Sequence, residues 1–378
     1  MTDSRSLIKR SDTDIHFMSI ALRLADSIKG RTFPNPSVGA VIVKNNEVIG
    51  TGATGECSGP HAEINALKMA GSRSRGATMY VTLEPCCHYG RTGPCTDAII
   101  RSGIRAVYLS IKDPNPLVNG RGMHLLRENG ITVVAGIGEK EAARINEDFF
   151  FWIAHHRPWV SIKLAMTLDG CIADGTGNSK WITSAAARKF AHDIRRRHAA
   201  IAIGAATLEK DNPKLTVRHG FHGNPVRFVF SSKEIVPFTS CFASRVGPGK
   251  HSGKKGQRSV LVVSGGSRSK QMRENGVELW RTGVRDMTDS LRAFLEMADE
   301  ENICSVLVEG GRRLVSCFLE SRLANRLYLF YGNKIIGNGI MGTSFKTGLP
   351  VARPIVLVEM EFHRFKNDIM ISGIPRWS

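Results

Sequence analysis

The chain has 378 residues, which is longer than a single hydrophobic core usually extends, so two domains are expected. Hydrophobic residues make up 42% and charged residues 23%, as in soluble globular proteins, and no apolar stretch approaches the roughly 18–20 residues of a membrane span. The formal net charge of +18 favours anionic partners such as nucleic acid, phosphorylated metabolites or dinucleotide cofactors.

The first 150 residues are predicted to alternate short strands with helices. Residues 1–10 have no apolar run, so we expect neither a signal peptide nor a transit peptide, and a cytoplasmic location is the simplest interpretation. The predicted strands are 38–43, 47–51, 77–83, 106–111 and 131–135. The predicted helices are 62–70, 96–102, 122–129 and a longer one around 139–153. This alternation predicts a layered α/β domain with parallel strand pairs over residues 1–150.

The pattern restarts after Arg157-Pro158, so residues 157–378 are predicted to form a second α/β domain with no internal repeat of the first. Its predicted strands are 159–165, 200–203, 227–231, 260–263, 303–308, 325–330 and a run near 356–358. Its predicted helices are 185–198, 287–299 and 312–323. A Gly/Ser-rich segment, 242–259, contains Lys250, Lys254, Lys255 and Arg258, and we interpret it as a solvated flexible loop rather than a binding site.

Three of the eight cysteines lie close together, which in a cytoplasmic chain indicates metal binding or catalysis rather than disulfides. His61 and Glu63 open a predicted helix, Cys86 follows a predicted strand, and Cys95 comes nine residues later. One imidazole and two thiolates give zinc three protein ligands and leave a fourth position for water, the arrangement of a catalytic site. Glu63, which is not a ligand, is placed to take a proton from that water and pass it to a departing amine.

The spacing departs from the general zinc-deaminase signature, in which a second Cys follows the first after two residues. Here Tyr89 occupies that position, so Cys87 and His88 are alternative ligands. We favour Cys86 with Cys95, because two adjacent cysteines would strain a tetrahedral site.

Several motifs resemble the bifunctional riboflavin biosynthesis deaminase/reductase family. In the first half they are residues 33–39 (FPNPSVG), 60–63 (PHAE), 82–86 (TLEPC), 90–95 (GRTGPC) and 113–116 (DPNP). The longer interval between cysteines is that family's own form. The resemblance implies that His61, Cys86 and Cys95 bind zinc, that Glu63 shuttles protons and that Asn35 helps to hold the pyrimidine. Asn35 between two prolines is equally well explained as a turn residue.

In the second half the same family is resembled by residues 163–170 (KLAMTLDG), 179–183 (SKWIT), 211–218 (DNPKLTVR) and 308–311 (VEGG). The resemblance implies a cytidine-deaminase-like three-layer domain followed by a dihydrofolate-reductase-like α/β domain. It implies NADPH contacts at Ala165, Trp181, Thr207, Asp211, Gly311, Arg312, Arg313, Leu314, Val315, Ser316 and Cys317. It implies substrate contacts at Lys163, Ser179, Arg195, Leu215, Arg218 and Glu309.

The glycine pair before residue 312 can also be interpreted without the resemblance. A strand that runs through Gly310 and Gly311 into a helix exposes backbone N–H groups to which a phosphate can bind, with Arg312 and Arg313 beside them. It is not the dinucleotide fingerprint, so by itself the signal is weak and a plain turn is the better explanation. Arg195 and Arg218 would suit a ribose 5-phosphate, although a lone arginine is more often a solvated surface charge.

The family reaction implied is deamination of 2,5-diamino-6-(5-phosphoribosylamino)pyrimidin-4(3H)-one, followed by NADPH reduction of 5-amino-6-(5-phosphoribosylamino)uracil to the ribitylamino product. We expect a homo-oligomer, a dimer or tetramer, with no nucleic-acid or membrane partner. One alternative is a nucleic-acid base deaminase with an accessory basic domain, which suits the +18 charge but gives the second domain no task. Another is a zinc-stabilised nucleic-acid-binding module, which would need a fourth ligand and no Glu63.

Overall fold

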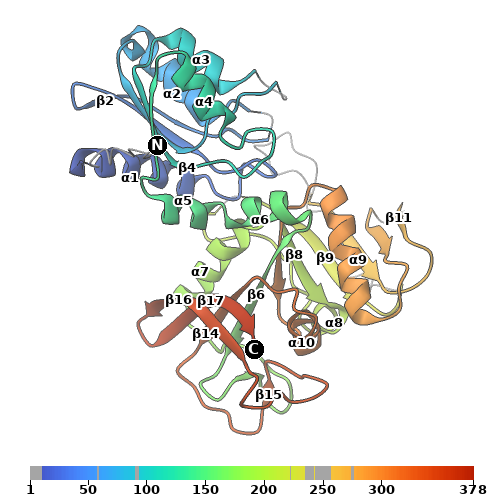
Figure 1. The fold of residues 1–378 in the computed structure, drawn as a ribbon. Helices are drawn as coiled ribbons and strands as arrows, with labels where there is room; N and C mark the ends of the chain where they lie inside the picture. The colour runs from blue at the N-terminus through green and yellow to red at the C-terminus, as the bar shows by residue number, and fades with distance from the viewer. Residues whose placement is uncertain are drawn as a thin grey trace. The chain divides into compact units, whose positions relative to one another are not determined.

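The computed structural model describes residues 11–57, 59–89, 93–221, 223–234, 242, 257–273 and 276–378 (Figure 1). The chain divides into two compact units, Met1–His155 and His156–Ser378. Lys250, Lys254 and Lys255 of the predicted basic loop, and residues 90–92 of the cysteine motif, lie outside the described residues. Within the described ranges, no helix has both the length and the apolar character needed to span a membrane.

The first unit is built on a five-stranded sheet with the strand order β2-β1-β3-β4-β5. Its strands are β1 (Gly39–Lys44), β2 (Glu47–Ala53), β3 (Thr78–Leu83), β4 (Ala106–Ile111) and β5 (Thr132–Ala135). The helices are α1 (Asp12–Ser27), α2 (Ala62–Ala70), α3 (Cys95–Ser102), α4 (Arg121–Glu128), α5 (Glu139–Ile145) and α6 (Glu147–His155), with a 3-10 turn at Gly71–Ser74. Strand β1 is antiparallel to β2 and β3, whereas β3, β4 and β5 are parallel.

Both faces of this sheet are covered, which makes the unit a three-layer structure. Along β1, Ala40 and Ile42 pack in one core cluster with residues of α2, α3 and α4. The alternate residues Val41 and Val43 pack in a second cluster with residues of α1 and α5. Because side chains alternate across a strand, a continuous apolar run such as β1 serves both clusters at once.

The second unit is built on a ten-stranded sheet in the order β11-β12-β10-β9-β8-β13-β6-β14-β17-β16, and β7 pairs separately with β15. Its strands are β6 (Trp159–Met166), β7 (Cys171–Ala173), β8 (Ala200–Gly204), β9 (Val226–Ser231), β10 (Ser259–Val263), β11 (Ser269–Met272), β12 (Glu278–Arg281), β13 (Ser305–Glu309), β14 (Arg326–Tyr331), β15 (Ile340–Met341), β16 (Ile355–Phe365) and β17 (Asp368–Trp377). The helices are α7 (Ala185–Arg196), α8 (Ala205–Asp211), α9 (Met287–Glu300) and α10 (Arg312–Glu320).

The centre of the large sheet, from β12 to β14, is parallel. Along β13, Val306 and Val308 pack in a cluster with α9 and α10, whereas Leu307 packs with α7. Helix α8 follows β8 directly, and α10 follows β13 after Gly310 and Gly311. The carboxyl ends of β8 and β13 therefore lie beside two helix N-termini, the edge at which α/β sheets usually bind ligands.

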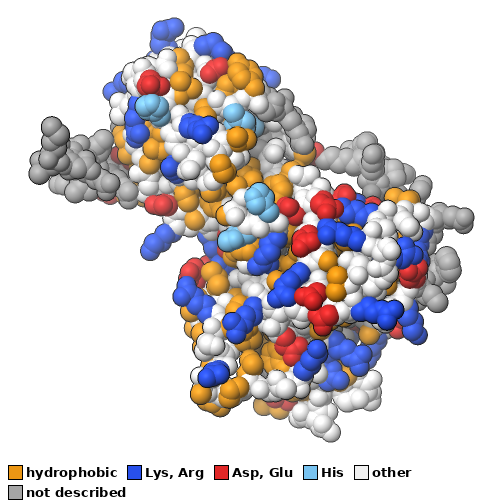
Figure 2. Space-filling view, turned by 45° about the vertical axis from the view of Figure 1, so that its right-hand side comes forward, with side chains coloured by type: hydrophobic (Ala, Val, Ile, Leu, Met, Phe, Trp, Pro, Cys, Tyr) orange, Lys and Arg blue, Asp and Glu red, His pale blue; other side chains and the backbone are white. Residues whose placement is uncertain are grey.

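Part of the excess positive charge is paired locally on the second unit. Arg268 contacts Glu296 and Glu300 at 3.0 and 2.6 Å, and Lys270 contacts Glu300 and Glu301 at 2.9 Å. Figure 2 shows basic side chains interspersed with acidic ones on the visible face of this unit. Exposed pairs of this kind add little stability, but they reduce the net field over that surface.

The fold class predicted from the sequence is confirmed, and most predicted elements are present. The single helix predicted around 139–153 is wrong, because the chain forms α5 and α6 with a break at Asn146. Asn146 ends α5 in a non-helical conformation, and its side chain bonds to the backbone of Ser37 instead of facing solvent. Further elements were not predicted from the sequence: α1, α8 and the strands β7, β11, β12, β15 and β17.

Helix α2 approaches β2 so closely that only glycine fits between them. A Cβ at Gly52 would lie 2.1 Å from the carbonyl oxygen of Ala62 and 2.5 Å from the nitrogen of Ala66. Ala62 is the first residue of α2, and it lies between His61 and Glu63. The small residue in β2 therefore allows α2 to hold these two side chains close to the sheet.

We predict that Gly52→Ala destabilises the first unit by about 1–3 kcal/mol, because the added methyl group meets backbone atoms that cannot rotate away. Denaturant unfolding of the purified variant measures this. Gly348→Ala is the control, since its Cβ meets no atom within 4 Å. Equal unfolding midpoints for the two variants would contradict the prediction.

Candidate active sites

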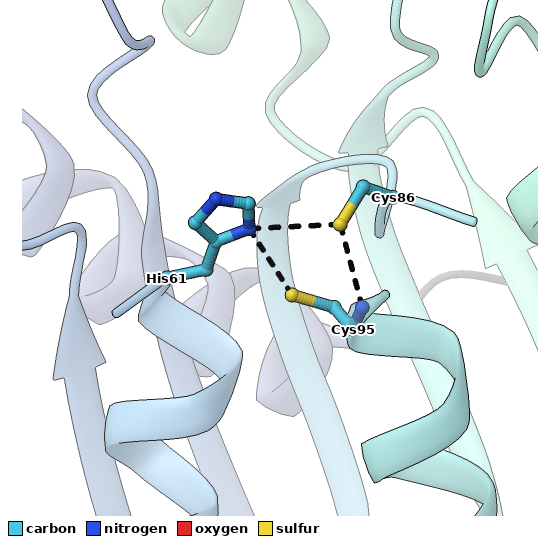
Figure 3. A group of neighbouring side chains, drawn as sticks. All are labelled: His61, Cys86 and Cys95. Carbon is cyan, nitrogen blue, oxygen red and sulfur yellow. Dashed lines mark hydrogen bonds between the residues drawn. The ribbon is translucent and has the colours of Figure 1, made fainter. Parts of the chain in front are cut away.

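In the first unit, three predicted ligands converge from the ends of three elements (Figure 3). His61 is the N-cap of α2, Cys86 follows β3, and Cys95 is the first residue of α3. His61 Nδ1 lies 3.2 Å from Cys95 Sγ and 3.6 Å from Cys86 Sγ, and all three ligand atoms lie within 4.8 Å of one another. Ligands about 2.0–2.3 Å from a zinc ion are separated by roughly 3–4 Å, so this set fits zinc.

The electrostatics of this cluster favour a cation. The backbone N–H of Cys95 donates to Cys86 Sγ at 3.3 Å, as expected at a helix N-terminus. The side-chain hydrogen bond from Cys95 to Cys86 lowers the pKa of Cys86 to about 4, against its partial burial. Glu63 is only 4% exposed, and this burial, with the Cys86 thiolate nearby, raises the pKa of Glu63 to about 7. A carboxyl group with such a pKa can both accept and release a proton near neutral pH.

The two alternative ligands are placed differently. Cys87 Sγ lies 3.8 Å from the carbonyl oxygen of Leu117, and Cys87 is not part of the ligand group. His88 Nδ1 is buried without a hydrogen-bond partner among the described residues. The structure therefore groups Cys95 rather than Cys87 with His61 and Cys86.

A cavity of about 270 Å³ opens beside the ligand group and is large enough for a small heterocycle. It is lined by Asn35, Pro36, Val38, Thr54, Gly59, His61, Glu63, Leu83, Glu84, Cys86, His88, Asp113, Asn115, Val118, Phe149 and Ile153. Asn35 therefore lies in the same cavity as Glu63. Sequence reasoning did not assign Asp113, Asn115 and Val118 to the site, although the DPNP motif contains two of them, and nothing in the local sequence indicated Phe149 or Ile153.

Glu84, another lining residue, organises the loop that carries Asp113. Its carboxylate accepts backbone hydrogen bonds from Asp113, Gly120 and Met123 at 2.9–3.2 Å. Burial raises the pKa of Asp113 to about 6, with the Glu84 charge as a further cause, while a bond from the Asn115 N–H opposes the shift. The cavity therefore also contains the carboxyl group of Asp113, which comes from a loop that supplies none of the three candidate zinc ligands.

In the second unit, the predicted substrate residues Arg195 and Glu309 bind each other. Arg195 Nε and Nη2 donate to the two oxygens of Glu309 at 2.9 Å, and Nη1 donates to the carbonyl oxygen of Thr216 at 2.6 Å. Glu309 is buried, yet Arg195 and Lys163 lower its pKa to about 2. Burial lowers the pKa of Lys163, which also lies over the ring of Phe330. These side chains form one charged cluster at the carboxyl end of β13.

Sequence reasoning missed His192, which lies one helical turn before Arg195 on α7 and is 7% exposed. Arg218 Nη2 donates to His192 Nε2 at 3.4 Å. Burial, together with the positive charges of Arg195 and Arg218, lowers the pKa of His192 to about 4, so this imidazole is neutral at pH 7. The spacing of His192 and Arg195 on one helix face was the available signal.

Four of the predicted cofactor residues, Thr207, Gly311, Arg312 and Arg313, lie near the N-termini of α8 and α10. Gly310 and Gly311 have φ of 73° and 80°, and a Cβ on Gly311 would lie 3.0 Å from Thr207 Oγ1. Asp211 is the last residue of α8 and is exposed, and Arg312 and Arg313 are exposed in the first turn of α10. The first backbone N–H groups of α8 and α10 have no partners within their helices, so they can donate to a phosphate bound at these N-termini.

Other predicted positions offer little side-chain surface to a ligand. Leu215 is 3% exposed, and Leu314, Val315 and Ser316 are buried in α10, with Ser316 Oγ accepting from the Ser344 N–H. Cys317 is half-buried next to them and its thiol pKa is raised by burial. Any contact at Leu314 would be made by its backbone.

The remaining predicted residues lie on other elements. Ala165 lies in β6, opposite Phe330 of β14, and Ser179 is half-buried. Trp181 is 61% exposed, and the Arg188 guanidinium lies 4.2 Å from its ring centroid.

Two family models match the chain. Residues 11–111 match the cytidine and deoxycytidylate deaminase zinc-binding region, and residues 158–371 match the RibD C-terminal domain. The riboflavin biosynthesis protein RibD of Aquifex aeolicus is 41% identical over 331 residues, which cover 87% of this chain and 89% of that protein. The Escherichia coli protein of the same name is 34% identical over 346 residues, 89% of this chain and 92% of that protein.

Solved structures agree with these matches. A diaminohydroxyphosphoribosylaminopyrimidine deaminase/5-amino-6-(5-phosphoribosylamino)uracil reductase from Thermotoga maritima is 36% identical, with a TM-score of 0.79. Acinetobacter baumannii RibD is 30% identical, with a TM-score of 0.83. Each comparison covers 96% of this chain and 99% of the other, so the similarity includes both units.

The ligand group makes a prediction about metal content. The purified protein should contain about one zinc ion per chain, and Cys95→Ser should lose it, because a neutral hydroxyl replaces a thiolate ligand. Cys87→Ser should keep the metal, since its Sγ is directed at Leu117. Elemental analysis of both variants measures this, and the reverse pattern would show that the second cysteine ligand was chosen wrongly.

Proposed function

Because this chain belongs to the RibD family of riboflavin biosynthesis proteins, we propose that it performs the two reactions for which its Thermotoga maritima relative is named. The substrate of the first is 2,5-diamino-6-(5-phosphoribosylamino)pyrimidin-4(3H)-one, which is deaminated. The second reduces 5-amino-6-(5-phosphoribosylamino)uracil to the ribitylamino product. The observation that carries the proposal is the grouping of His61, Cys86 and Cys95 beside buried Glu63, in a chain whose other half is the RibD C-terminal domain.

We assign the deaminase to the first unit, predicted as residues 1–150 and delimited in the structure as Met1–His155. Its three ligands fit zinc, which when bound there lowers the pKa of a water molecule and so supplies hydroxide near neutral pH. Glu63 takes the proton of the attacking water and delivers it to the departing amine, a role that suits a pKa near neutrality. Asn35, in the same cavity, orients the pyrimidine ring.

We assign the reductase to residues 157–378. NADPH supplies the hydride, and the protein supplies alignment and charge. The free N–H groups around Gly311 and the nearby Thr207 bind the cofactor phosphates, with Arg312 and Arg313 exposed beside them. The charged cluster of Lys163, Arg195, Glu309 and Arg218 binds the ribose phosphate end of the substrate.

We propose a cytoplasmic enzyme with small-molecule substrates and no nucleic-acid partner. Among the described residues, Cys86, Cys87, Cys95, Cys171 and Cys317 form no disulfide, as expected in a reducing compartment. The acidic partners of Arg268 and Lys270 interrupt the positive surface that a nucleic acid would need. In addition, a deaminase that acts on nucleic-acid bases would not need a reductase domain.

The two activities should separate genetically. Glu63→Gln keeps the size of the side chain but cannot accept a proton, so deamination should fall by ~10²–10⁴-fold while zinc stays bound. Reduction should be unchanged when the deaminated ribosyl compound and NADPH are supplied directly. The measurements are amine release for the first reaction and the 340-nm absorbance of NADPH for the second.

Arg218→Ala should have the converse effect, impairing reduction and leaving deamination unchanged. Loss of a charge-assisted contact should raise the KM of the reductase for its ribosyl substrate by about 10–100-fold and leave deamination at its normal rate. If Glu63→Gln lowers both activities with zinc retained and the fold unchanged, the units are not independent catalysts and this assignment is wrong.

We also propose that the protein is a homo-oligomer, a dimer or tetramer, which covers an open edge of the ten-stranded sheet. Strand β16 is that edge, and it exposes Val356, Met360 and Phe362 by 44%, 52% and 62%. An edge strand of this length with exposed apolar side chains invites pairing with another chain. A second copy of the chain presents the same edge strand, so pairing of the two strands supplies hydrogen-bond partners for the backbone groups of both.

The oligomer is tested by light scattering on a sizing column. The wild-type mass should be a multiple of 41.5 kDa, and Phe362→Glu should shift it towards the monomer, because a buried unpaired charge is costly. Met272→Glu, on β11 at the opposite edge, is the matched control and should not change the mass. A monomeric wild type would reject the oligomer, and a shift only in Met272→Glu would place the interface on the other edge.

A further inference from the structure

The loop that carries Asn35 is held by a residue more than one hundred positions later in the chain. Asn146, between α5 and α6, is 1% exposed. Its Oδ1 accepts from the Ser37 N–H at 2.8 Å, and its Nδ2 donates to the Ser37 carbonyl oxygen at 2.9 Å. One side chain therefore satisfies both backbone groups of a residue only two positions from Asn35.

The other end of the loop is fixed to the same short segment. Lys29 Nζ contacts Asp148 Oδ1 at 2.5 Å, and the two side chains are only 9% and 6% exposed. Asp148 lies in the first turn of α6, two residues after Asn146. Separating such a buried ion pair would leave an unpaired charge in a poorly hydrated site, so the two side chains stay in contact. Residues 29 and 37 are thus both anchored to residues 146–148.

Within the loop, Thr32 connects these anchors to Asn35. Thr32 is 1% exposed, and its Oγ1 donates to the Asn35 carbonyl oxygen at 2.9 Å and lies 3.2 Å from Ser37 Oγ. The Asn35 N–H donates in return to the Thr32 carbonyl oxygen at 2.9 Å. The backbone of Asn35 therefore has little freedom once Ser37 is held.

The same segment also supplies part of the cavity. Phe149 and Ile153, on the first and second turns of α6, line it together with Asn35 and Glu63. The deaminase zinc-binding model matches only residues 11–111, so α6 lies beyond that module. One side of the cavity is consequently built by residues 146–153 and by the loop that these residues hold.

We propose that Asn146 is a positioning residue of the deaminase, which fixes Asn35 through Ser37 and so sets the affinity of the cavity for the pyrimidine. Residues 146–153 then belong to the substrate site, although they contribute neither a zinc ligand nor the proton shuttle. The inference rests on the proposed function of the cavity as the pyrimidine site.

The first test is Asn146→Ala in the full-length, zinc-loaded protein. Deamination should show a KM raised on the order of tenfold, with a smaller change in kcat, because the Ser37 groups lose two buried hydrogen bonds and Asn35 is no longer fixed. Zinc content and both kinetic constants of the reductase should match the wild type. The substrate Kd measured by calorimetry should rise equally when Asn146→Ala is added to Glu63→Gln, in which slow turnover leaves the substrate intact during the measurement.

Asn325→Ala is the matched control, since Asn325 Oδ1 accepts from the Val160 N–H at 2.9 Å in the second unit. It releases a comparable backbone group and should leave the deamination KM unchanged. Thr32→Val is a second variant that preserves side-chain shape but removes the bond to the Asn35 carbonyl, so it reports on the loop even if Asn146→Ala does not fold. It should raise the KM in the same direction.

Three results would overturn the inference. They are a wild-type KM and Kd in folded Asn146→Ala, a wild-type KM in Thr32→Val, or an equal rise in Asn325→Ala that marks general destabilisation. Failure of the proposed function is distinguishable from these, because it would appear as a wild-type protein that retains zinc but releases no amine from the diaminopyrimidine.

Discussion

The deaminase site depends on the burial of three acidic side chains around one imidazole. Glu63 and Cys95 are almost fully buried, and Cys86 is partly so. Burial is the largest cause of the rise in the pKa of Glu63 to about 7, and the charge of Cys86 adds to it, so a further negative charge in this small volume is unfavourable without a cation. A bound divalent cation offsets this, because both thiols can then ionise beside Glu63. The close contact of α2 with Gly52 serves the same requirement by holding His61 and Glu63 near the two cysteines.

The zinc ligands could be predicted because their chemistry is concentrated in two short motifs. His61 and Glu63 are two residues apart at the start of α2, and Cys86 and Cys95 lie at the two ends of one loop. Asn146, Phe149 and Ile153 could not be predicted, since nothing in their own neighbourhood distinguishes them from ordinary helix residues. Their contribution appears only when the chain brings residues 146–153 against residues 29–37. Specificity here comes from tertiary contacts, whereas the reactive groups come from local sequence.

The missed elements have separate physical causes. Helix α1 begins with a capping box in which Ser11 and Asp14 bond reciprocally. The spacing of these two residues in the sequence could have predicted the start of this helix. Strand β17 contains Gly373 and Pro375, which argue against a strand, yet Pro375 is tolerated opposite Leu357 in the pairing with β16. The break between α5 and α6 lies at Asn146, whose side chain bonds to the Ser37 backbone, a contact that competes with regular helix.

In the reductase unit, the positive charge of Arg195 is balanced by an ion pair with Glu309, which reduces what it can offer to a phosphate. Arg195 and Glu309 were each predicted to contact substrate, but they form a bidentate pair that is electrically neutral and only about an eighth exposed. A phosphate dianion bound at the charged cluster therefore needs a positive charge in addition to this neutral pair. Arg218 offers it, because its neighbour His192 is neutral at pH 7 and so does not compete as an ion. We therefore propose that Arg218 selects the phosphorylated substrate, while the Arg195–Glu309 pair supplies polar contacts at the carboxyl end of β13.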